Sequence, residues 1–200
     1  MREGRPECAV PRAQAERSDA ARNRRRIVDA ARGMVRARGV ESLSMEDVAQ
    51  SAGVGVGTVY RRFGDRAGLA YALLDERERE FQEAFLSGPP PLGPGAEPAA
   101  RIRAFLRALL ERVDEQSGLL LVAETSGPHA RYASGAYLTH RAHLVELLRQ
   151  VRPHGDPQVL ADALLAPLSA VAVSYQREVA GLSLDRISAG LDELVTALAG

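Results

Sequence analysis

The sequence predicts an all-α protein: a small N-terminal helical domain followed by a larger C-terminal helical body. Apolar residues recur at helical spacing in most windows, and Ser, Asp, Gly and Pro stand where helices would begin or end. No window alternates β-branched and polar residues as a strand would. We expect a disordered arm over 1–20, a small domain of three helices over 21–66 and a body over 67–200.

Local signals place the helices of the N-terminal domain. A stripe at i, i+3, i+4, i+7 and i+8 predicts a first helix that Gly39 ends; its members are Ile27, Ala30, Ala31, Met34 and Val35. Ser44 is the expected N-cap of a second, short helix, and Gly53 ends that helix. A third helix is expected from Gly55 to Arg62, with Val59 and Phe63 buried. Asp65 then caps a longer helix.

Within the body, a Pro/Gly-rich loop over 87–98 follows the helix that Asp65 caps. We expect long helices over 99–116, 132–151, 157–180 and 184–199, with a short apolar segment over 119–123 between the first two. Pro167 is expected to kink the third of these helices, because proline removes a backbone donor and clashes with the preceding turn.

Composition excludes several classes of function. All 26 basic residues are arginines, so chemistry that needs a lysine amine is ruled out, including the usual P-loop, the kinase core and Schiff-base catalysis. The single cysteine, Cys8, cannot form an internal disulfide. No apolar run reaches the roughly 20 residues of a membrane helix, and no secretory signal is evident, so we expect a cytoplasmic protein.

Charge is distributed unevenly, although the whole chain is neutral. Residues 1–66 hold 14 arginines and 9 acidic residues, a net charge of +5, and the remainder carries −5. A basic third on an acidic remainder is typical of a polyanion-binding module, and a solvated basic tail explains the charge alone equally well. Arg24, Arg25 and Arg26 leave the same two interpretations open.

The most specific signal is a helix-turn-helix over residues 45–62. Ala49 is small where two helices would cross, Gly53 allows a positive-φ turn, and Val54 and Val59 anchor the second helix to the first. That helix would then project a tyrosine, a threonine and two arginines outward, which suits the phosphates of a DNA groove.

This motif resembles the TetR family of bacterial transcriptional regulators, over about Arg24 to Ala70. The resemblance rests on Ser44-Met45-Glu46-Asp47-Val48-Ala49, Ala52-Gly53-Val54, Gly57-Thr58-Val59-Tyr60-Arg61-Arg62-Phe63 and Asp65-Arg66. It implies phosphate contacts by Ser44, Thr58, Tyr60 and Arg66, and base-facing positions at Gly55, Val56 and Gly57. Glycine at 55 and valine at 56 provide no hydrogen-bonding side chain to read base edges, although Val56 suits a thymine methyl group. Arg61 and Arg62 contact phosphates or read guanine.

Other candidate sites are weaker. The glycines at 53, 55 and 57 do not match a dinucleotide fingerprint, because the third comes one residue early and a helix precedes them. His140 and His143 have a spacing that can hold a metal, with Glu146 on the same face, but no third ligand is obvious. Helix surface or pocket wall is the favoured interpretation, and we expect no metal or cofactor.

For the body, the resemblance implies a ligand-binding and dimerisation domain. The last two predicted helices have more apolar faces than one surface helix needs, which suggests packing across a two-fold axis; an intramolecular core is the alternative. A largely aliphatic pocket is expected near Phe105, Leu109, Tyr137, His140 and Tyr175.

Together these observations predict a homodimeric repressor that binds a palindromic DNA operator and is released by a small apolar ligand. Two alternatives remain at this point: a lysine-free helical enzyme, and a small-molecule carrier with no DNA role.

Overall fold

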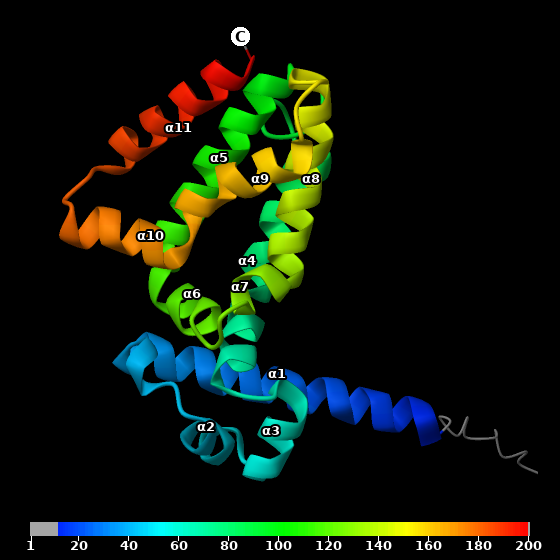
Figure 1. The fold of residues 1–200 in the computed structure, drawn as a ribbon. Coiled ribbons are helices and arrows are strands. Elements are labelled where there is room, and N and C mark those ends of the chain that lie inside the picture. The colour runs from blue at the N-terminus through cyan, green and yellow to red at the C-terminus, as the bar shows by residue number, and fades with distance from the viewer. Residues whose placement is uncertain (1–11, 200) are drawn as a thin grey trace, which may run out of the picture. The chain divides into compact units, whose positions relative to one another are not determined.

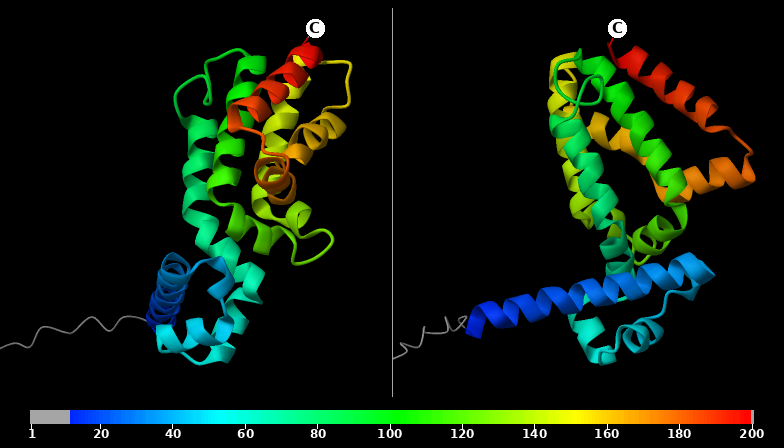
Figure 2. Two further views of the ribbon diagram at one scale, coloured as in Figure 1. Left: turned by 90° about the vertical axis from the view of Figure 1, so that its left-hand side faces the viewer. Right: turned by 180° about the vertical axis from the view of Figure 1, so that it is seen from behind.

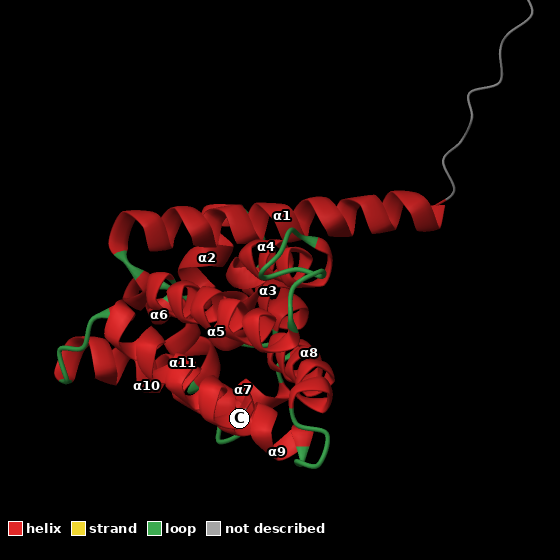
Figure 3. Ribbon diagram, turned by 90° about the horizontal axis from the view of Figure 1, so that it is seen from above, coloured by secondary structure: helices red, strands yellow, loops and turns green. Residues whose placement is uncertain are grey.

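The computed structural model describes residues 12–199, and within this range every regular element is helical and no strand occurs (Figures 1 and 3). The predicted all-α class is confirmed. The chain divides into two compact units, residues 1–69 and 70–200, three residues beyond the expected boundary. Residues 12–20, expected in the disordered arm, are helical, whereas residues 1–11, with Cys8, lie outside the described part.

Unit 1 contains the predicted three-helix arrangement. Its elements are α1 (Arg12–Arg38), η1 (Val40–Ser42), α2 (Met45–Ala52), α3 (Val56–Phe63) and the first turn of α4 (Arg66–Ser87). Helix α1 supplies an apolar stripe that includes the fully buried Ile27 and Ala31; α2 packs against α1 and buries Val48 and Ala49. Burial of these faces, rather than the propensity of two eight-residue helices, stabilises the unit.

Unit 2 is a helical body built on α5 (Figure 2). Helix α5 packs against α8 and against α11, and α9 packs against α8. Large side chains with almost no exposure fill the centre, including Phe85, Phe105, Leu144 and Leu165. Besides the rest of α4, its elements are α5 (Pro98–Glu115), α6 (Ser117–Glu124), α7 (Ala130–Ala133), α8 (Gly135–Val151), α9 (Pro157–Leu165), η2 (Ala166–Leu168), α10 (Ala170–Ser174), the π-helical segment η3 (Tyr175–Val179) and α11 (Leu184–Ala199).

Two predicted helices of the body are divided. The helix expected over 157–180 is four pieces, α9, η2, α10 and η3, with a bend of 44° between the first two and the last two. Pro167 lies in the short η2 turn, and Ser169 then caps α10 by accepting a hydrogen bond from Ala172 N (3.2 Å). The helix expected over 132–151 is interrupted at Ser134, which caps α8 in the same way. The kink at Pro167 is confirmed, and it is a complete break.

Among residues 12–199, no single helix is long and apolar enough to cross a membrane. Only α9–η2 joined to α10–η3 across their bend meets that requirement of length and composition.

Candidate nucleic-acid interface

The first helix of the motif begins at a side-chain cap. Ser44 has extended backbone, and its Oγ accepts a hydrogen bond from Asp47 N (3.2 Å), as the sequence predicted. Helix α2 buries Met45, Val48, Ala49 and Ala52 and leaves Glu46, Asp47 and Gln50 exposed. The cap sets where α2 begins, and burial of its apolar side chains leaves the acidic residues on the outward face.

The turn of the motif depends on Gly53 and on an arginine from α1. Gly53 has φ 63° and ψ 42°, the left-handed conformation that glycine adopts without a steric penalty. Arg26 Nη2 donates to the carbonyl of Ala52 (2.6 Å), a group that the end of α2 would leave unpaired. A Cβ added to Gly53 would stand 3.0 Å from that same nitrogen. Arg26 thus stabilises the turn, which is a role the sequence did not reveal.

Helix α3 is anchored through one side chain and open on the opposite side. Val59 is fully buried, and Phe63 is half-buried beneath the guanidinium of Arg24 (5.9 Å to the ring centroid). The predicted contact positions Gly55, Val56, Gly57, Tyr60, Arg61 and Arg62 are exposed, and Thr58 is half-buried. The structure therefore brings the predicted DNA-contacting residues of α3 to one accessible face.

The two glycines at the start of α3 are not required by packing within unit 1. Both have ordinary negative φ, and a Cβ added to Gly55 or Gly57 would meet no atom within 4 Å. Gly55 is the N-cap residue but offers no side-chain cap; Thr58 N donates to its carbonyl (2.8 Å), so the N–H groups of Val56 and Gly57 are the ones that remain able to donate outward. The small side chains leave room for another molecule to approach this backbone closely.

Tyr60 is held by a carboxylate of α2. Its hydroxyl donates to Glu46 Oε1 (3.1 Å), and the hydrogen bond and the charge of Glu46 raise the pKa of the Tyr60 phenol above its ordinary value. Ser44 Oγ lies 3.4 Å from the other oxygen of the same carboxylate. Two predicted phosphate contacts, from separate elements, therefore meet at Glu46.

The remaining predicted DNA contacts are arginines, and they differ in the contacts that they make within the protein. Arg61 is exposed, Arg62 donates to the carbonyl of Ala20, and Arg66 donates to the carbonyl of Val40 (3.0 Å) while lying 3.8 Å from Glu41. These contacts explain how a cation is tolerated in the first turn of α4, where the helix dipole disfavours it.

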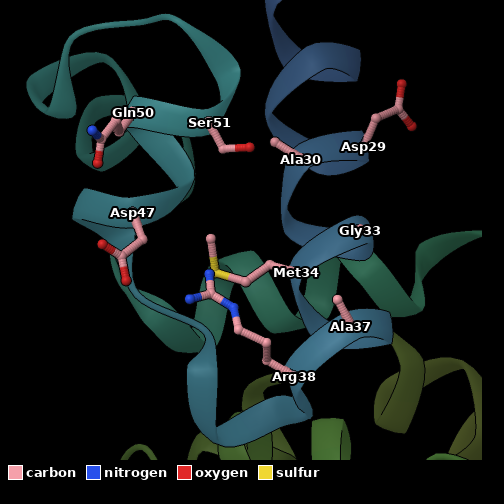
Figure 4. A pocket seen from close by; sticks show the side chains of 9 residues that line it. All are labelled: Asp29, Ala30, Gly33, Met34, Ala37, Arg38, Asp47, Gln50 and Ser51. Carbon is pink, nitrogen blue, oxygen red and sulfur yellow. The ribbon is translucent and has the colours of Figure 1, made fainter.

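An open groove of about 560 Å³ runs between α1 and α2 on unit 1 (Figure 4). Asp29, Asp47 and Arg38 contribute charged groups to its walls, and Met34 contributes an apolar one. Asp47 thus faces this groove, whereas its neighbour Glu46 contacts Tyr60.

Comparison with known proteins matches this unit. The family model described as bacterial regulatory proteins of the tetR family matches residues 27–73, which span the motif and its supporting helices. Residues 27–73 are therefore similar to the bacterial regulatory proteins of the tetR family. An HTH-type transcriptional regulator of Staphylococcus aureus is 41% identical over 58 residues, which are 29% of this chain and 31% of that protein. The match thus spans about a third of the length of such curated relatives.

Solved structures of bacterial transcriptional regulators share the fold beyond the motif. A TetR-like transcriptional regulator from Rhodococcus sp. RHA1 matches with a TM-score of 0.55 and 24% identity, over 96% of this chain and 99% of that one. The regulator FadR from Bacillus subtilis, solved with stearoyl-CoA, matches with a TM-score of 0.61 and 16% identity, over 85% and 96%. At these identities the likeness establishes the fold of both units.

Four of the five predicted ligand-pocket residues lie in the interior of unit 2. Phe105, Leu109, Tyr137 and His140 are buried, whereas Tyr175 is 59% exposed and does not join them. The helix that was expected to be kinked at Pro167 is broken there, and Tyr175 lies beyond the break in the π-helical segment η3, where its side chain faces outward. The rings of Phe105 and His140 lie 5.6 Å apart, within a cluster completed by Phe81, Phe85 and His143.

A charged pair that the sequence did not predict borders this cluster. Glu78 bonds to His140 Nε2 through one oxygen (2.9 Å) and pairs with Arg112 through the other (2.7 Å). Burial raises the pKa of Glu78, but the hydrogen bond from His140 and the charges of His140 and Arg112 outweigh it, so the pKa lies below its usual value. His140 is therefore committed to Glu78, and the described residues hold no group of three metal-ligating side chains.

A second buried pair closes the break between α9 and α10. Arg131 Nε lies 3.3 Å from Glu124 Oε1, and both side chains are only 11% exposed. Arg131 Nη2 donates to the carbonyl of Leu165 (2.9 Å), and Glu124 Oε2 accepts from Ala170 N (2.8 Å). One ion pair thus satisfies a backbone group on each side of the break. The signal in the sequence was a charged residue directly after the apolar run 119–123.

Proposed function

We propose that this chain is a transcriptional regulator of the TetR type, a homodimeric repressor that binds a palindromic operator and leaves it when a small apolar ligand binds. The observation that carries the proposal is the accessible face of α3, which is anchored by Val59 and presents Val56, Tyr60 and Arg61. A rigid helix with such residues on its open side is suited to the major groove.

Each predicted contact group would have a matching partner on DNA. Hydroxyls of Ser44, Thr58 and Tyr60 and the guanidinium groups of Arg61, Arg62 and Arg66 would bind phosphate oxygens, which fixes the helix on the duplex. Val56 would contact a thymine methyl group, and Gly55 and Gly57 would allow the backbone to approach the groove. With few side chains to read base edges, a large share of the specificity would come from the spacing of half-sites and from DNA shape.

A dimer supplies the second recognition helix. Apolar side chains on the last two predicted helices are exposed, among them Val171 (53%), Tyr175 (59%) and Val179 (74%), which are spaced four residues apart. A second copy packed on this surface would cover it and supply a second α3 helix, and a palindromic operator requires the two recognition helices about one turn of DNA apart, roughly 34 Å. Such a regulator would act in the bacterial cytoplasm.

The ligand is proposed to bind in unit 2 beside Phe105, Leu109, Tyr137 and His140. Aromatic and aliphatic side chains dominate there, which favours an apolar ligand. FadR, whose fold matches this chain over 85% of the length, was solved with stearoyl-CoA, and this supports a ligand with an apolar part. Coupling between ligand and operator is expected at roughly 1–3 kcal/mol.

The first test is selection of bound fragments from random duplex DNA, followed by inspection of the consensus for a two-fold palindrome. Binding of wild type and Tyr60→Ala to the consensus and to an unrelated duplex is then measured by fluorescence anisotropy over a range of salt concentrations.

Tyr60→Ala is expected to weaken binding to both duplexes and to lower the salt dependence, because a phosphate contact is lost. Tyr132→Ala, which removes an exposed tyrosine of unit 2, is the control. Wild-type protein that shows no salt-dependent binding to any duplex would leave a ligand carrier as the better description. Unchanged affinity of Tyr60→Ala would remove that residue from the interface.

A further inference from the structure

Glu46 lies at the centre of the proposed phosphate-binding face. Its two carboxylate oxygens are within hydrogen-bond distance of the hydroxyl of Tyr60 (3.1 Å) and the hydroxyl of Ser44 (3.4 Å). These two hydroxyls belong to different elements, the N-cap of α2 and the middle of α3, and are 16 residues apart in sequence. Among the described residues, the carboxylate of Glu46 is the only anionic group within hydrogen-bond distance of both hydroxyls.

Each of these hydroxyls can donate to Glu46 or to a DNA phosphate, but not to both at once. A serine or tyrosine hydroxyl carries one proton, so it donates to one acceptor at a time. Ser44 Oγ accepts from Asp47 N, and its single proton is the group that it can offer to an acceptor such as a carboxylate or a phosphate. A carboxylate and a phosphate are both acceptors without donors at neutral pH. While Glu46 holds these protons, a DNA phosphate cannot.

We propose that Glu46 is a positioning residue that takes the place of a DNA phosphate in the free protein and is exchanged for that phosphate when DNA binds. This inference rests on the proposed function. In the free protein Glu46 orders Tyr60 and Ser44 for the incoming phosphate. In the complex the negative charge of Glu46 still lies near the DNA phosphates and repels them, whatever the DNA sequence. Glu46 thereby restrains non-specific binding.

Glu46→Gln tests the inference, because glutamine keeps the shape and an acceptor oxygen but removes the charge. The matched control is Asp47→Asn, which removes the same charge from the same turn of α2 but faces the groove toward α1 (Figure 4). Both residues stand in the first turn of α2, so both variants lose a similar helix-dipole interaction. A difference between them in DNA binding therefore reports the place of the charge.

Glu46→Gln is expected to bind the consensus duplex and an unrelated duplex about fourfold more tightly per protomer at low salt, from the repulsion of two charges about 5 Å apart in water. The gain should shrink as salt is raised, because the repulsion is screened. Asp47→Asn should gain less. In the absence of DNA, titration of ring-labelled tyrosine by NMR should show the pKa of Tyr60 falling toward its ordinary value in Glu46→Gln and not in Asp47→Asn.

The outcomes separate the inference from the proposed function. Wild-type protein that binds no duplex refutes both. If wild type binds and Glu46→Gln gains no more than Asp47→Asn, or binds more weakly, only the role of Glu46 is refuted. A larger gain for Glu46→Gln on both duplexes, with the shift of Tyr60, supports the exchange of carboxylate for phosphate.

Discussion

At the scale of single residues, environment decides what each side chain can do. Tyr60 is 44% exposed and is held by a carboxylate, whereas His140 is 5% exposed and bonds to Glu78. His143 is the neighbouring case without a polar partner: its Nε2 is buried and unpaired, and its ring lies 4.5 Å from Phe85 and 5.1 Å from Phe105. Burial, with the charges of Arg101 and His140, lowers the pKa of His143 to about 4.

His143 should therefore make the protein less stable in mild acid. Its folded-state pKa of about 4 lies below the value near 6.5 of an unfolded chain, so between these values the unfolded state binds the extra proton. The free energy of unfolding should fall as the pH falls from about 6.5 to 4. Urea denaturation of wild type and His143→Phe across this range measures the effect, and the variant should lose less stability. Equal losses in the two proteins would contradict the assignment to His143.

At the level of helices, the break between α9 and α10 depends on contacts from other elements for the pairing of its backbone groups. Proline and a serine cap end one helix and begin another, and the open carbonyl of Leu165 and N–H of Ala170 are paired with Arg131 and Glu124. Burial is the main cause that raises the pKa of Glu124, and the hydrogen bond from Ala170 and the charges of Arg131 and Arg112 oppose it. The ion pair thus joins α6 and α7 to both sides of the break.

Arg131→Met should destabilise the protein by about 3 kcal/mol, because it leaves a buried carboxylate without its cation and a carbonyl without its donor. The loss in the free energy of unfolding should be smaller in mild acid, because Glu124 then takes up a proton. Without Arg131 the pKa of Glu124 is raised further, which favours this protonation. Arg149→Met, which breaks the exposed pair with Glu146, should change stability by less than about 0.5 kcal/mol. Chemical denaturation at pH 7.5 and pH 5 compares the two; similar effects of both changes would refute the role of the buried pair.

At the scale of the whole molecule, the proposed regulator needs two copies of the chain. The exposed apolar residues of α10 and η3 form the surface expected at the interface between the two copies. In the dimer the partner would cover these residues. This requirement follows from DNA geometry, because one short recognition helix reads only a half-site.

Val171→Arg should therefore convert a dimer of about twice 21.5 kDa into a monomer, since a charge replaces an apolar side chain at the interface. Light scattering after size-exclusion chromatography measures the mass, and operator affinity should fall with it. Leu86→Arg, at a similarly exposed position at the end of α4, is the control and should leave the mass unchanged. A Val171→Arg protein that stays dimeric would place the interface elsewhere.

The sequence by itself determined the three-helix motif, its caps at Ser44 and Asp65, its turn at Gly53 and the outward face of α3. These features follow from residues within a few positions of one another, where periodicity, capping and positive φ act directly. Tertiary structure alone decided the pairing of Arg26 with Ala52, of Tyr60 with Glu46 and of Arg131 with Leu165, and the exposure of Tyr175. Such contacts join residues 14 to 34 positions apart, so they depend on how the helices pack.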